Sequence, residues 1–324
     1  MITLDDIRAA ETRIRDRVHR TPFLGSRTLA ARAGASRVSL KCENLQKTGS
    51  FKVRGVLNKL SRLDATARAR GVVGFSAGNH AQALAWCAHA AGVRCTVVMP
   101  VTAPRSKVDA SRGYGATVVQ VPTNADAFQR ARELAESEGF TFVHPFDDDA
   151  IIAGGGTVAL EILEQSDRVD LLVIPIGGGG LIAGAAIAMR ALSPHTRIVG
   201  VEPTGACGMR QSLDAGRALH IDAPSSIADG LAAPMAGEHT FEIVSRYVDD
   251  VVLVSDEEIG EAMTLLLSRC KLLAEGAGAA AAAALIGGKV GVKASDNVVV
   301  MVSGGNVDLS RLSQLEGARA DLSR

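Results

Sequence analysis

The stretch KCENLQKTGSFKVRG, residues 41–55, follows the apolar run 38–40 and decides how the rest of this sequence is interpreted. The apolar run predicts a strand, and Ser50 is of the residue type that caps a helix N-terminus. Lys52 would then lie in the first helical turn, next to Phe51. An apolar neighbour and the positive end of a helix both lower the pKa of a lysine. Lys52 is therefore a candidate nucleophile that forms a Schiff base with a carbonyl carbon; the alternative is an ordinary surface lysine.

The composition and the net charge of the chain indicate what kind of fold it forms and what kind of partner it binds. The 324 residues are enough for two lobes that each bury a core, and 47% of them are hydrophobic but only 3% aromatic. Cores of Ala, Val, Leu and Ile suit a parallel sheet covered by Ala-rich helices. Lys and Arg together number 35, as do Asp and Glu, so the net charge favours neither nucleic acid nor an anionic membrane as a partner. We therefore expect a small-molecule substrate.

The cysteines and the apolar runs point to the compartment. Five cysteines are dispersed without CxxC spacing, which is typical of reduced thiols in a cytoplasmic protein. The first residues show no basic segment followed by an apolar one, so we expect no signal peptide. The apolar run 277–286 is too short to span a bilayer. We expect a soluble cytoplasmic protein with no membrane partner.

Strand-like and helix-like patterns alternate along the chain, separated by short turns marked by Gly or Pro. Further strands are predicted at residues 72–75, 95–99, 117–121, 171–176, 197–202, 251–254 and 297–302. Helices are predicted at residues 5–18, 29–34, 79–91, 104–114, 126–138, 151–164, 181–192 and 256–270. This alternation indicates an α/β fold built on parallel sheets.

Four consecutive glycines at residues 177–180 lie between a predicted strand and a predicted helix. Their backbone N–H groups can converge on an anion beside the positive end of the helix. No Lys-Ser/Thr pair follows, so the tract is not a nucleoside-triphosphate loop. Gly178, Gly180 and Ala183 also fit a weak dinucleotide fingerprint, with Glu202 placed for a ribose hydroxyl. The pattern alone leaves a phosphate site, a dinucleotide site and a tight structural turn open.

Taken with the glycines, residues 41–55 resemble the cofactor-lysine segment of fold type II pyridoxal-phosphate enzymes, above all the branch of serine/threonine dehydratases and serine racemase. The resemblance continues, in order and spacing, at residues 76–82, 144–148, 177–184, 227–231, 271–278 and 303–308. It implies a two-lobed α/β fold like that of tryptophan synthase β, with a mostly parallel sheet flanked by helices in each lobe. Residues 1–70 and 146–324 would form the large cofactor-binding domain, and residues 71–145 a small inserted domain. Relatives of this kind are dimers or tetramers, so we expect a homodimer or homotetramer.

The resemblance also implies which residues hold pyridoxal 5′-phosphate and the substrate. Lys52 would bind the cofactor covalently and act as the catalytic base. The implied cofactor-binding residues are Phe51, Lys52, Asn79, Gly177, Gly178, Gly179, Gly180, Leu181 and Ser303. The implied substrate-binding residues are Ser76, Ala77, Gly78, Asn79 and His80. The residues themselves leave simpler roles open, since Asn79 and His80 can cap a helix and Ser303 can end a strand.

By resemblance, the expected activity is β-elimination from L-threonine and/or L-serine, which gives a 2-oxo acid and ammonia. Ala77 stands where serine racemases carry a proton-transferring serine, and Phe146 where they carry an amide, so both positions favour a dehydratase. His80 stands where cysteine synthases carry threonine. Alternatives are serine racemisation and the dehydration of another 3-hydroxy amino acid, such as 3-hydroxyaspartate. Two further alternatives belong to other classes: an NAD-dependent oxidoreductase and a pyridoxal-phosphate-binding protein without catalysis.

Two glutamates outside these lists have alternative interpretations. Glu202 matches a divalent-metal ligand of some relatives, with the carbonyl group of Ala206 as a second ligand. The next acidic ligand would fall at Gly208, which has no side chain, so we expect no metal site and interpret Glu202 as a capping carboxylate. Glu275 either lines the cofactor or interacts with the N-terminus of a helix.

Overall fold

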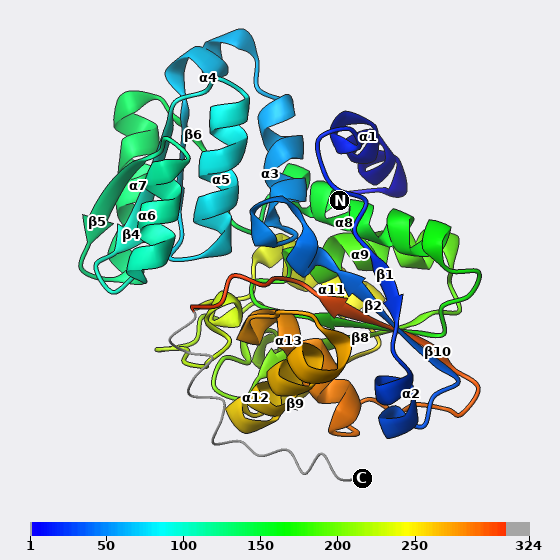
Figure 1. The fold of residues 1–324 in the computed structure, drawn as a ribbon. Helices are drawn as coiled ribbons and strands as arrows, with labels where there is room; N and C mark the ends of the chain where they lie inside the picture. The colour runs from blue at the N-terminus through cyan, green and yellow to red at the C-terminus, as the bar shows by residue number, and fades with distance from the viewer. Residues whose placement is uncertain (1, 309–324) are drawn as a thin grey trace.

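Two sheets organise the computed structural model, which describes residues 2–308. The described strands are β1 (Phe23–Gly25), β2 (Arg37–Cys42), β3 (Val72–Phe75), β4 (Cys95–Pro100), β5 (Thr117–Val121), β6 (Thr141–Phe142), β7 (Leu171–Pro175), β8 (Arg197–Pro203), β9 (Asp250–Val254) and β10 (Asn297–Val302). The larger sheet has the order β1-β2-β10-β7-β8-β9, and the smaller sheet has the order β5-β4-β3-β6. β1 is antiparallel to β2, and the other described pairs are parallel. Figure 1 shows the two lobes side by side, which confirms the predicted two-lobed α/β architecture.

Helices flank both sheets. The described helices are α1 (Leu4–Ile14), α2 (Arg27–Ala33), α3 (Lys52–Ser61), α4 (Ala65–Arg70), α5 (Asn79–Ala90), α6 (Arg105–Gly113), α7 (Asn124–Glu138), α8 (Asp149–Gln165), α9 (Gly180–Leu192), α10 (Gly208–Ala215), α11 (Glu238–Tyr247), α12 (Asp256–Leu265) and α13 (Gly276–Ile286). Short helical turns are η1 (Glu43–Leu45), η2 (Lys47–Gly49) and η3 (Asp229–Leu231), and α12 continues as the π-helix η4 (Leu266–Cys270). Every helix predicted from a pattern is present, with its ends shifted by a few residues. The patterns missed the helices α4, α10, α11 and α13 and the very short strands β1 and β6.

Alternation along the strands assigns side chains to the two faces of the larger sheet. In β10, Val298 and Val300 pack into one core, whereas Val299 and Met301 pack into the other. Successive strand residues point to opposite faces, so a strand that is buried on both faces appears as one continuous apolar run. α12 and α13 cover the first face, and α8 and α9 cover the second (Figure 1).

Glycines bring α3, α8 and α9 into direct backbone contact. A side-chain carbon at Gly154 of α8 would lie 2.6 Å from the carbonyl oxygen of Arg54 on α3. A carbon at Gly156 of α8 would lie 2.7 Å from the carbonyl oxygen of Gly184 on α9. Neither position has room for a larger residue in so closely packed an interior. The helix that begins at Lys52 is thereby fixed relative to the helix that begins at Gly180.

A buried charge network ties β2 to α3 and α8. Arg54 donates hydrogen bonds of 2.8 Å to both carboxylate oxygens of Glu43 and one of 2.7 Å to Glu161. Lys41 donates to Glu161 at 2.6 Å and to the carbonyl oxygen of Thr21 at 3.0 Å. Lys41, Glu43 and Arg54 are at most 1% exposed. Two cations and two carboxylates balance one another, and each has hydrogen-bond partners, as burial of a charge requires.

The described residues include the apolar run 277–286 and all five cysteines. Among residues 2–308, no helix is both long enough and apolar enough to cross a membrane. α13, which contains the apolar run 277–286, is buried in the core of the larger sheet. All five cysteines are free thiols.

Candidate active site

Three neighbouring strands of the larger sheet end at one place. β2, β10 and β7 are adjacent, and their carboxyl ends lead to Lys52, Ser303 and the glycine tract (residues 177–180). The backbone N–H of Phe51 donates to the carbonyl oxygen of Ser303 at 3.1 Å, so two of these segments are in direct contact. In α/β sheets, ligands bind at the carboxyl ends of parallel strands where the strand order reverses. The predicted site residues therefore meet where this kind of fold binds ligands.

Lys52 begins α3, as predicted, and its surroundings favour the neutral amine. Its Nζ atom donates a hydrogen bond of 2.8 Å to the carbonyl oxygen of Pro145 and lies 5.1 Å from the centre of the Phe51 ring. Desolvation disfavours the ammonium form and lowers the pKa of Lys52 from 10.5 to about 8. A lysine with this pKa can act as a nucleophile near neutral pH.

The predicted helix cap at Ser50 is wrong. The N-cap residue of α3 is Phe51, and no side chain caps this end of the helix. Ser50 has an extended backbone, with φ of −162°, and pairs with Gly304 after β10. This pairing joins the segment to the larger sheet and holds Ser50 outside the capping geometry. The buried Ser50 hydroxyl has no hydrogen-bond partner in the described part of the chain.

The glycine tract forms a cradle for an anion. Gly179 has φ of +95°, a left-handed conformation that favours glycine, and α9 begins at the next residue. In the part of the chain that the structure describes, the N–H groups of residues 177–181 have no hydrogen-bond acceptor. Buried N–H groups are nearly always paired, so five unpaired donors in succession at a helix N-terminus indicate an anion site. A side-chain carbon at Gly178 would lie 2.3 Å from the Phe146 ring, so a larger residue cannot replace this glycine.

A second helix N-terminus with unpaired donors comes from the smaller sheet. After β3, the Oγ atom of Ser76 accepts a hydrogen bond of 3.0 Å from the N–H of Gly78 and shapes the turn into α5. Within residues 2–308, the N–H groups of Ala77, Asn79 and His80 have no acceptor. α5 has 12 residues, and its aligned peptide dipoles place a partial positive charge at this turn. The turn therefore suits a carboxylate.

His80 is buried and neutral. Its Nε2 atom lies 3.1 Å from the carbonyl oxygen of Val143, so Nε2 carries the proton and Nδ1 is an acceptor. Burial, with a smaller effect of the Lys52 charge, lowers the pKa of His80 to about 3. The Nδ1 atom has no hydrogen-bond partner in the described chain.

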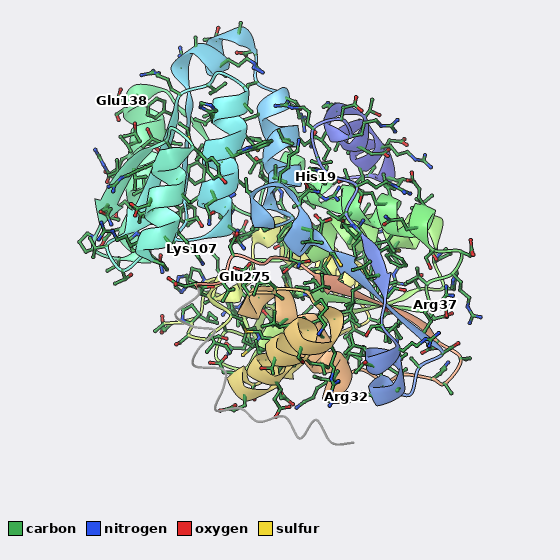
Figure 2. The ribbon with its side chains drawn as sticks, viewed as in Figure 1. His19, Arg32, Arg37, Lys107, Glu138 and Glu275 are labelled. Carbon is green, nitrogen blue, oxygen red and sulfur yellow. The ribbon has the colours of Figure 1, made fainter. Side chains whose placement is uncertain are left out.

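Asn79 joins the two lobes through a chain of polar side chains. Its Nδ2 atom donates to the carboxylate of Glu275, which precedes α13 but makes no capping hydrogen bond. Its Oδ1 atom accepts a hydrogen bond of 2.9 Å from Asn306, whose Nδ2 atom also donates to the carbonyl oxygen of Thr48 at 2.7 Å. Burial raises the pKa of Glu275 to about 7, although Lys107 and the Asn79 hydrogen bond oppose the increase. Figure 2 shows Lys107 and Glu275 on facing edges of the two lobes.

An ion pair crosses the same boundary. The Nζ atom of Lys107 on α6 lies 2.9 Å from a carboxylate oxygen of Asp229 in η3. The same Nζ atom would lie 3.6 Å from a side-chain carbon at Gly78, so a cation adjoins the turn into α5. Lys107 could not be predicted from the sequence, because a single lysine in a helix carries no pattern. The Pro145 carbonyl and Asn306 were not predicted either, although both lie in the segments that carry the resemblance.

Comparison with known proteins identifies the family. A family model described as "Pyridoxal-phosphate dependent enzyme" matches residues 14–304. The chain belongs to the pyridoxal-phosphate-dependent enzymes. It is 43% identical over 316 residues to L-threonine ammonia-lyase of Thermotoga maritima, covering 97% of this chain and 78% of that protein. It is 44% identical over 319 residues to the catabolic L-threonine dehydratase TdcB of Staphylococcus aureus, covering 97% of this chain and 91% of that protein.

Solved structures confirm the fold type II class of this pyridoxal-phosphate-dependent enzyme. Maize serine racemase superposes with a TM-score of 0.92 and 38% identity, covering 98% of this chain and 97% of that one. The threonine deaminase of T.th. superposes with a TM-score of 0.89 and 42% identity, covering 95% of this chain and 99% of that one.

The residues of the site fit pyridoxal 5′-phosphate. The unpaired N–H groups of residues 177–181 suit its phosphate, and the amine of Lys52 suits its aldehyde. The Oε2 atom of Glu275 and the hydroxyl of Ser50 are buried and have no hydrogen-bond partner among residues 2–308, as expected of polar atoms that face a ligand. The hydroxyl of Ser303 donates to the carbonyl oxygen of Ala277 at 3.2 Å, and its lone pairs are left to accept a hydrogen bond.

Glu202 caps α10, which confirms the preferred interpretation of this residue. Its two carboxylate oxygens accept hydrogen bonds from the N–H groups of Met209 at 2.9 Å and Arg210 at 2.8 Å. Burial raises the pKa of Glu202 to about 7. Ala206 is buried beside it, and its N–H donates to the carbonyl oxygen of Pro203. Within residues 2–308, no group of three or more His, Cys, Asp or Glu side chains is placed to hold a metal ion.

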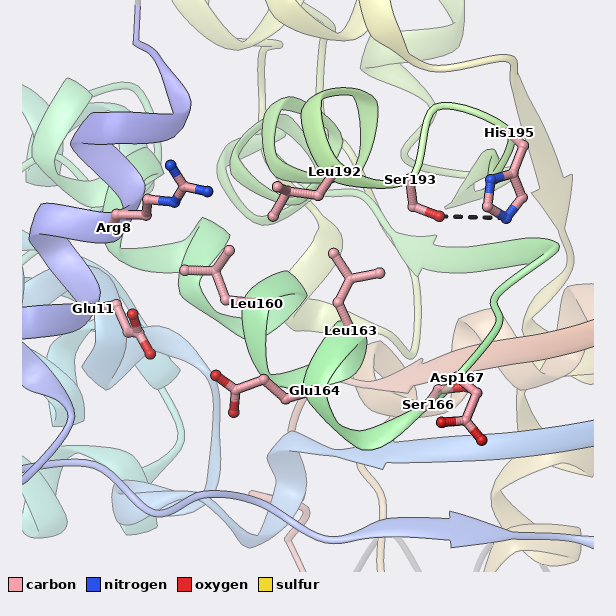
Figure 3. A pocket seen from close by; sticks show the side chains of 10 residues that line it. All are labelled: Arg8, Glu11, Leu160, Leu163, Glu164, Ser166, Asp167, Leu192, Ser193 and His195. Atoms are coloured by element: carbon pink, nitrogen blue, oxygen red, sulfur yellow. Dashed lines mark hydrogen bonds between the residues drawn. The ribbon is translucent and has the colours of Figure 1, made fainter.

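A crevice of about 520 Å³ lies away from these residues (Figure 3). Its lining includes Arg8 of α1, Glu164 near the end of α8 and His195 after α9. α9 has 13 residues and is about 20 Å long, so the crevice and the glycine tract lie at opposite ends of this helix. Figure 3 shows a hydrogen bond of 3.5 Å between Ser193 and His195 in it. The crevice shares no residue with the candidate active site.

Proposed function

We propose that this pyridoxal-phosphate-dependent enzyme is an ammonia-lyase that converts L-threonine and/or L-serine to a 2-oxo acid and ammonia. The observation that carries the proposal is the position of Lys52, a lysine of low pKa whose Nζ atom donates to the carbonyl oxygen of Pro145. The next residue, Phe146, packs its ring against Gly178 of the glycine tract. The relatives named as a threonine ammonia-lyase and a threonine dehydratase support the same reaction.

In this proposal Lys52 has two tasks. Its Nζ atom holds the cofactor covalently between turnovers, and during turnover the free amine removes the proton from Cα of the substrate. The bound cofactor supplies the electron sink that stabilises the charge left on Cα. The hydrogen bond to the Pro145 carbonyl orients Nζ, and desolvation lowers the pKa of Lys52 to about 8, so a large share of the amine is unprotonated near that pH.

The other site residues bind and orient. The N–H groups of residues 177–181 would hold the phosphate, and Asn79 would donate to the phenolic oxygen. The Ser303 hydroxyl, which donates its proton to the carbonyl oxygen of Ala277, would accept a hydrogen bond from a protonated pyridine nitrogen. The substrate carboxylate binds at the α5 turn, where the N–H groups of Ala77, Asn79 and His80 have no acceptor within residues 2–308 and Lys107 adds a positive charge. Ala77 has no proton to transfer, so Lys52 is the single acid or base that we assign next to Cα.

The test is direct. Purified protein loaded with pyridoxal 5′-phosphate is incubated with L-threonine, L-serine or 3-hydroxyaspartate, and 2-oxo acid and ammonia are measured. We expect equal amounts of both products from at least one of the first two substrates. Turnover of 3-hydroxyaspartate alone would replace the proposed substrate, and an absence of both products from every substrate would contradict the proposal.

Serine racemisation is the second candidate, and the superposition with maize serine racemase favours it. Ala77 opposes it, because racemisation needs a second proton-transferring group on the face opposite the lysine. Chiral chromatography of L-serine incubations separates the two. D-Serine formed faster than pyruvate would favour the racemase.

We also propose the larger organisation of the protein. Residues 1–70 and 146–324 form the large domain and residues 71–145 the small one, in a homodimer or homotetramer in the cytoplasm. Residues 309–324 lie outside the described residues. Strands β3 to β6 all fall within residues 71–145, and the free cysteines suit a reducing compartment. Size-exclusion chromatography with light scattering tests the oligomer, since a monomer at micromolar concentration would contradict it.

A further inference from the structure

Thr240 of α11 contacts the glycine tract from behind. Its Oγ1 atom donates a hydrogen bond of 2.7 Å to the carbonyl oxygen of Gly178 and lies 3.1 Å from the carbonyl oxygen of Gly237. Thr240 is completely buried. A hydroxyl with two carbonyl oxygens around it acts as a donor only, so its proton is shared between them. The hydroxyl therefore fixes the direction of the Gly178 carbonyl.

That direction determines where the next N–H group points. The peptide bond between Gly178 and Gly179 is trans, so the carbonyl oxygen of one and the N–H of the other point in opposite directions. The N–H of Gly179 consequently points away from Thr240, and it has no acceptor within residues 2–308. A side-chain carbon at Gly179 would lie 2.8 Å from Cβ of Thr240, so Thr240 packs directly against this glycine and leaves no room for a larger residue.

Asp147 holds Thr240 in place. Its carboxylate accepts hydrogen bonds of 3.1 Å from the N–H groups of Thr240 and Glu238, in the first turn of α11. The residue at the N-cap position, Gly237, provides no capping side chain, and a carbon on it would lie 2.3 Å from the Asp147 carboxylate. Asp147 thus caps α11 from a distant part of the chain. It lies in the segment that also carries the Pro145 carbonyl, the acceptor for Lys52.

We propose that Thr240, held by Asp147, is a positioning residue for the cofactor phosphate: it fixes the Gly178 carbonyl so that the N–H of Gly179 faces the phosphate. The inference rests on the assignment of the phosphate to the glycine tract. Without the Thr240 hydroxyl, the Gly178 carbonyl loses a buried partner, and the peptide that follows it is free to turn its N–H away. Binding of the phosphate is weakened, whereas binding through the aldehyde is not.

The test compares Thr240→Val with Thr240→Ser, because valine keeps the volume and serine keeps the hydroxyl. Dissociation constants of pyridoxal 5′-phosphate and of pyridoxal, which lacks the phosphate, are measured on cofactor-free protein from changes in absorbance. We expect Thr240→Val to bind pyridoxal 5′-phosphate about tenfold more weakly, as for the loss of one hydrogen bond. We expect unchanged pyridoxal binding and near wild-type affinity in Thr240→Ser.

Thr264→Val is the matched control, since Thr264 donates to the carbonyl oxygen of Gly260 at 3.0 Å in α12, away from the site. It should bind both compounds as the wild type does. Equal weakening of both compounds by Thr240→Val, or unchanged affinity for pyridoxal 5′-phosphate, would overturn the proposal. The ³¹P chemical shift of the bound cofactor provides a second readout, and it should change in Thr240→Val only. These measurements need no turnover, so a protein that binds the cofactor but releases no 2-oxo acid would contradict the lyase proposal and leave this one standing.

Discussion

The Nζ atom of Lys52 lies 2.8 Å from the carbonyl oxygen of Pro145, to which it donates a hydrogen bond. The next residue after Pro145 is Phe146, whose ring packs against the backbone of Gly178. One short segment therefore contacts both the reactive amine and the anion cradle. This arrangement sets the distance between the two ends of the cofactor site through residues 145–146.

The low pKa of Lys52 predicts how the capture of cofactor depends on pH. The protonated amine cannot attack the aldehyde, so the rate should rise about tenfold per pH unit below pH 8 and level off above it. Stopped-flow absorbance after mixing cofactor-free protein with pyridoxal 5′-phosphate measures this rate. The urea-unfolded chain serves as the control, because its lysines have ordinary pKa values near 10.5 and its rate should still rise at pH 9. A folded protein with the same profile as the unfolded chain would contradict the assignment.

Replacing Lys52 by alanine should abolish turnover. The variant keeps the glycine tract and should still bind the cofactor, but weakly and without a covalent link. Borohydride reduction of cofactor-loaded wild-type protein, followed by peptide mapping, should place the adduct on Lys52. Lys47→Ala is the matched control, since this lysine lies in the same stretch but packs over the Trp86 ring. An adduct on another lysine, or turnover in Lys52→Ala, would rule out the mechanism.

Glu275 makes the stability of the cofactor-free protein depend on pH. Its pKa is about 7 in the folded protein and 4.5 ordinarily, so between these pH values the folded state binds more protons than the unfolded state. The free energy of unfolding therefore falls as the pH rises from 4.5 to 7. Glu275→Gln has no titrating carboxyl group at this position and does not lose this stability. The free energy of unfolding of the variant minus that of the wild type should therefore be larger at pH 8 than at pH 5. Urea titrations at the two pH values measure the difference.

The matched control for that experiment is Glu136→Gln, at an exposed position on α7. Its stability relative to the wild type should be the same at both pH values. The buried residues Glu202 and His80 add the same pH dependence to the free energy of unfolding of the wild type and of each variant, so their effect cancels in the comparison. A difference for Glu275→Gln that stays constant with pH would show that the carboxyl group is not protonated in the folded state.

Removing one charge from the buried network of Lys41, Glu43, Arg54 and Glu161 should lower the free energy of unfolding. Glu43→Gln leaves the Arg54 guanidinium without one of its two carboxylates, and we expect the free energy of unfolding to fall by about 3 to 5 kcal/mol. Glu133→Gln, at the exposed ion pair with Arg130, should change it by at most about 1 kcal/mol. Chemical denaturation at pH 7 measures both. Equal effects of the two substitutions would contradict the network.

The same network predicts a dependence on acid. Although burial opposes ionisation of Glu43, the Arg54 guanidinium holds its pKa below the ordinary value of 4.5. The stabilisation is therefore present above pH 4.5 and is lost as the pH falls through the lower pKa of the folded protein. The stability difference between the wild type and Glu43→Gln should shrink accordingly in denaturation series below pH 4.5.

Local patterns were sufficient for most of the secondary structure, and they predicted candidate roles for single residues. The alternation of strands and helices predicted the α/β class, and Lys52 lies at the start of a helix as expected. Ser50 shows the limit of such patterns, because its residue type favours a cap but its backbone pairs with Gly304, which is distant in sequence. Capping is a local preference worth about 1 kcal/mol, and tertiary pairing overrides it.

By itself, the sequence indicated Lys52 as the candidate nucleophile, four glycines that can bind an anion and a capping carboxylate at Glu202, since each prediction depends on residue type and on neighbours along the chain. Only the tertiary structure decided that Pro145 faces Lys52, that Thr240 holds Gly178 and that Arg54 lies between Glu43 and Glu161. These contacts depend on the order of strands β2, β10 and β7, which brings three distant carboxyl ends to one edge of the sheet. The order is set by how the helices pack on both faces of the sheet, and no single segment of the chain contains that information.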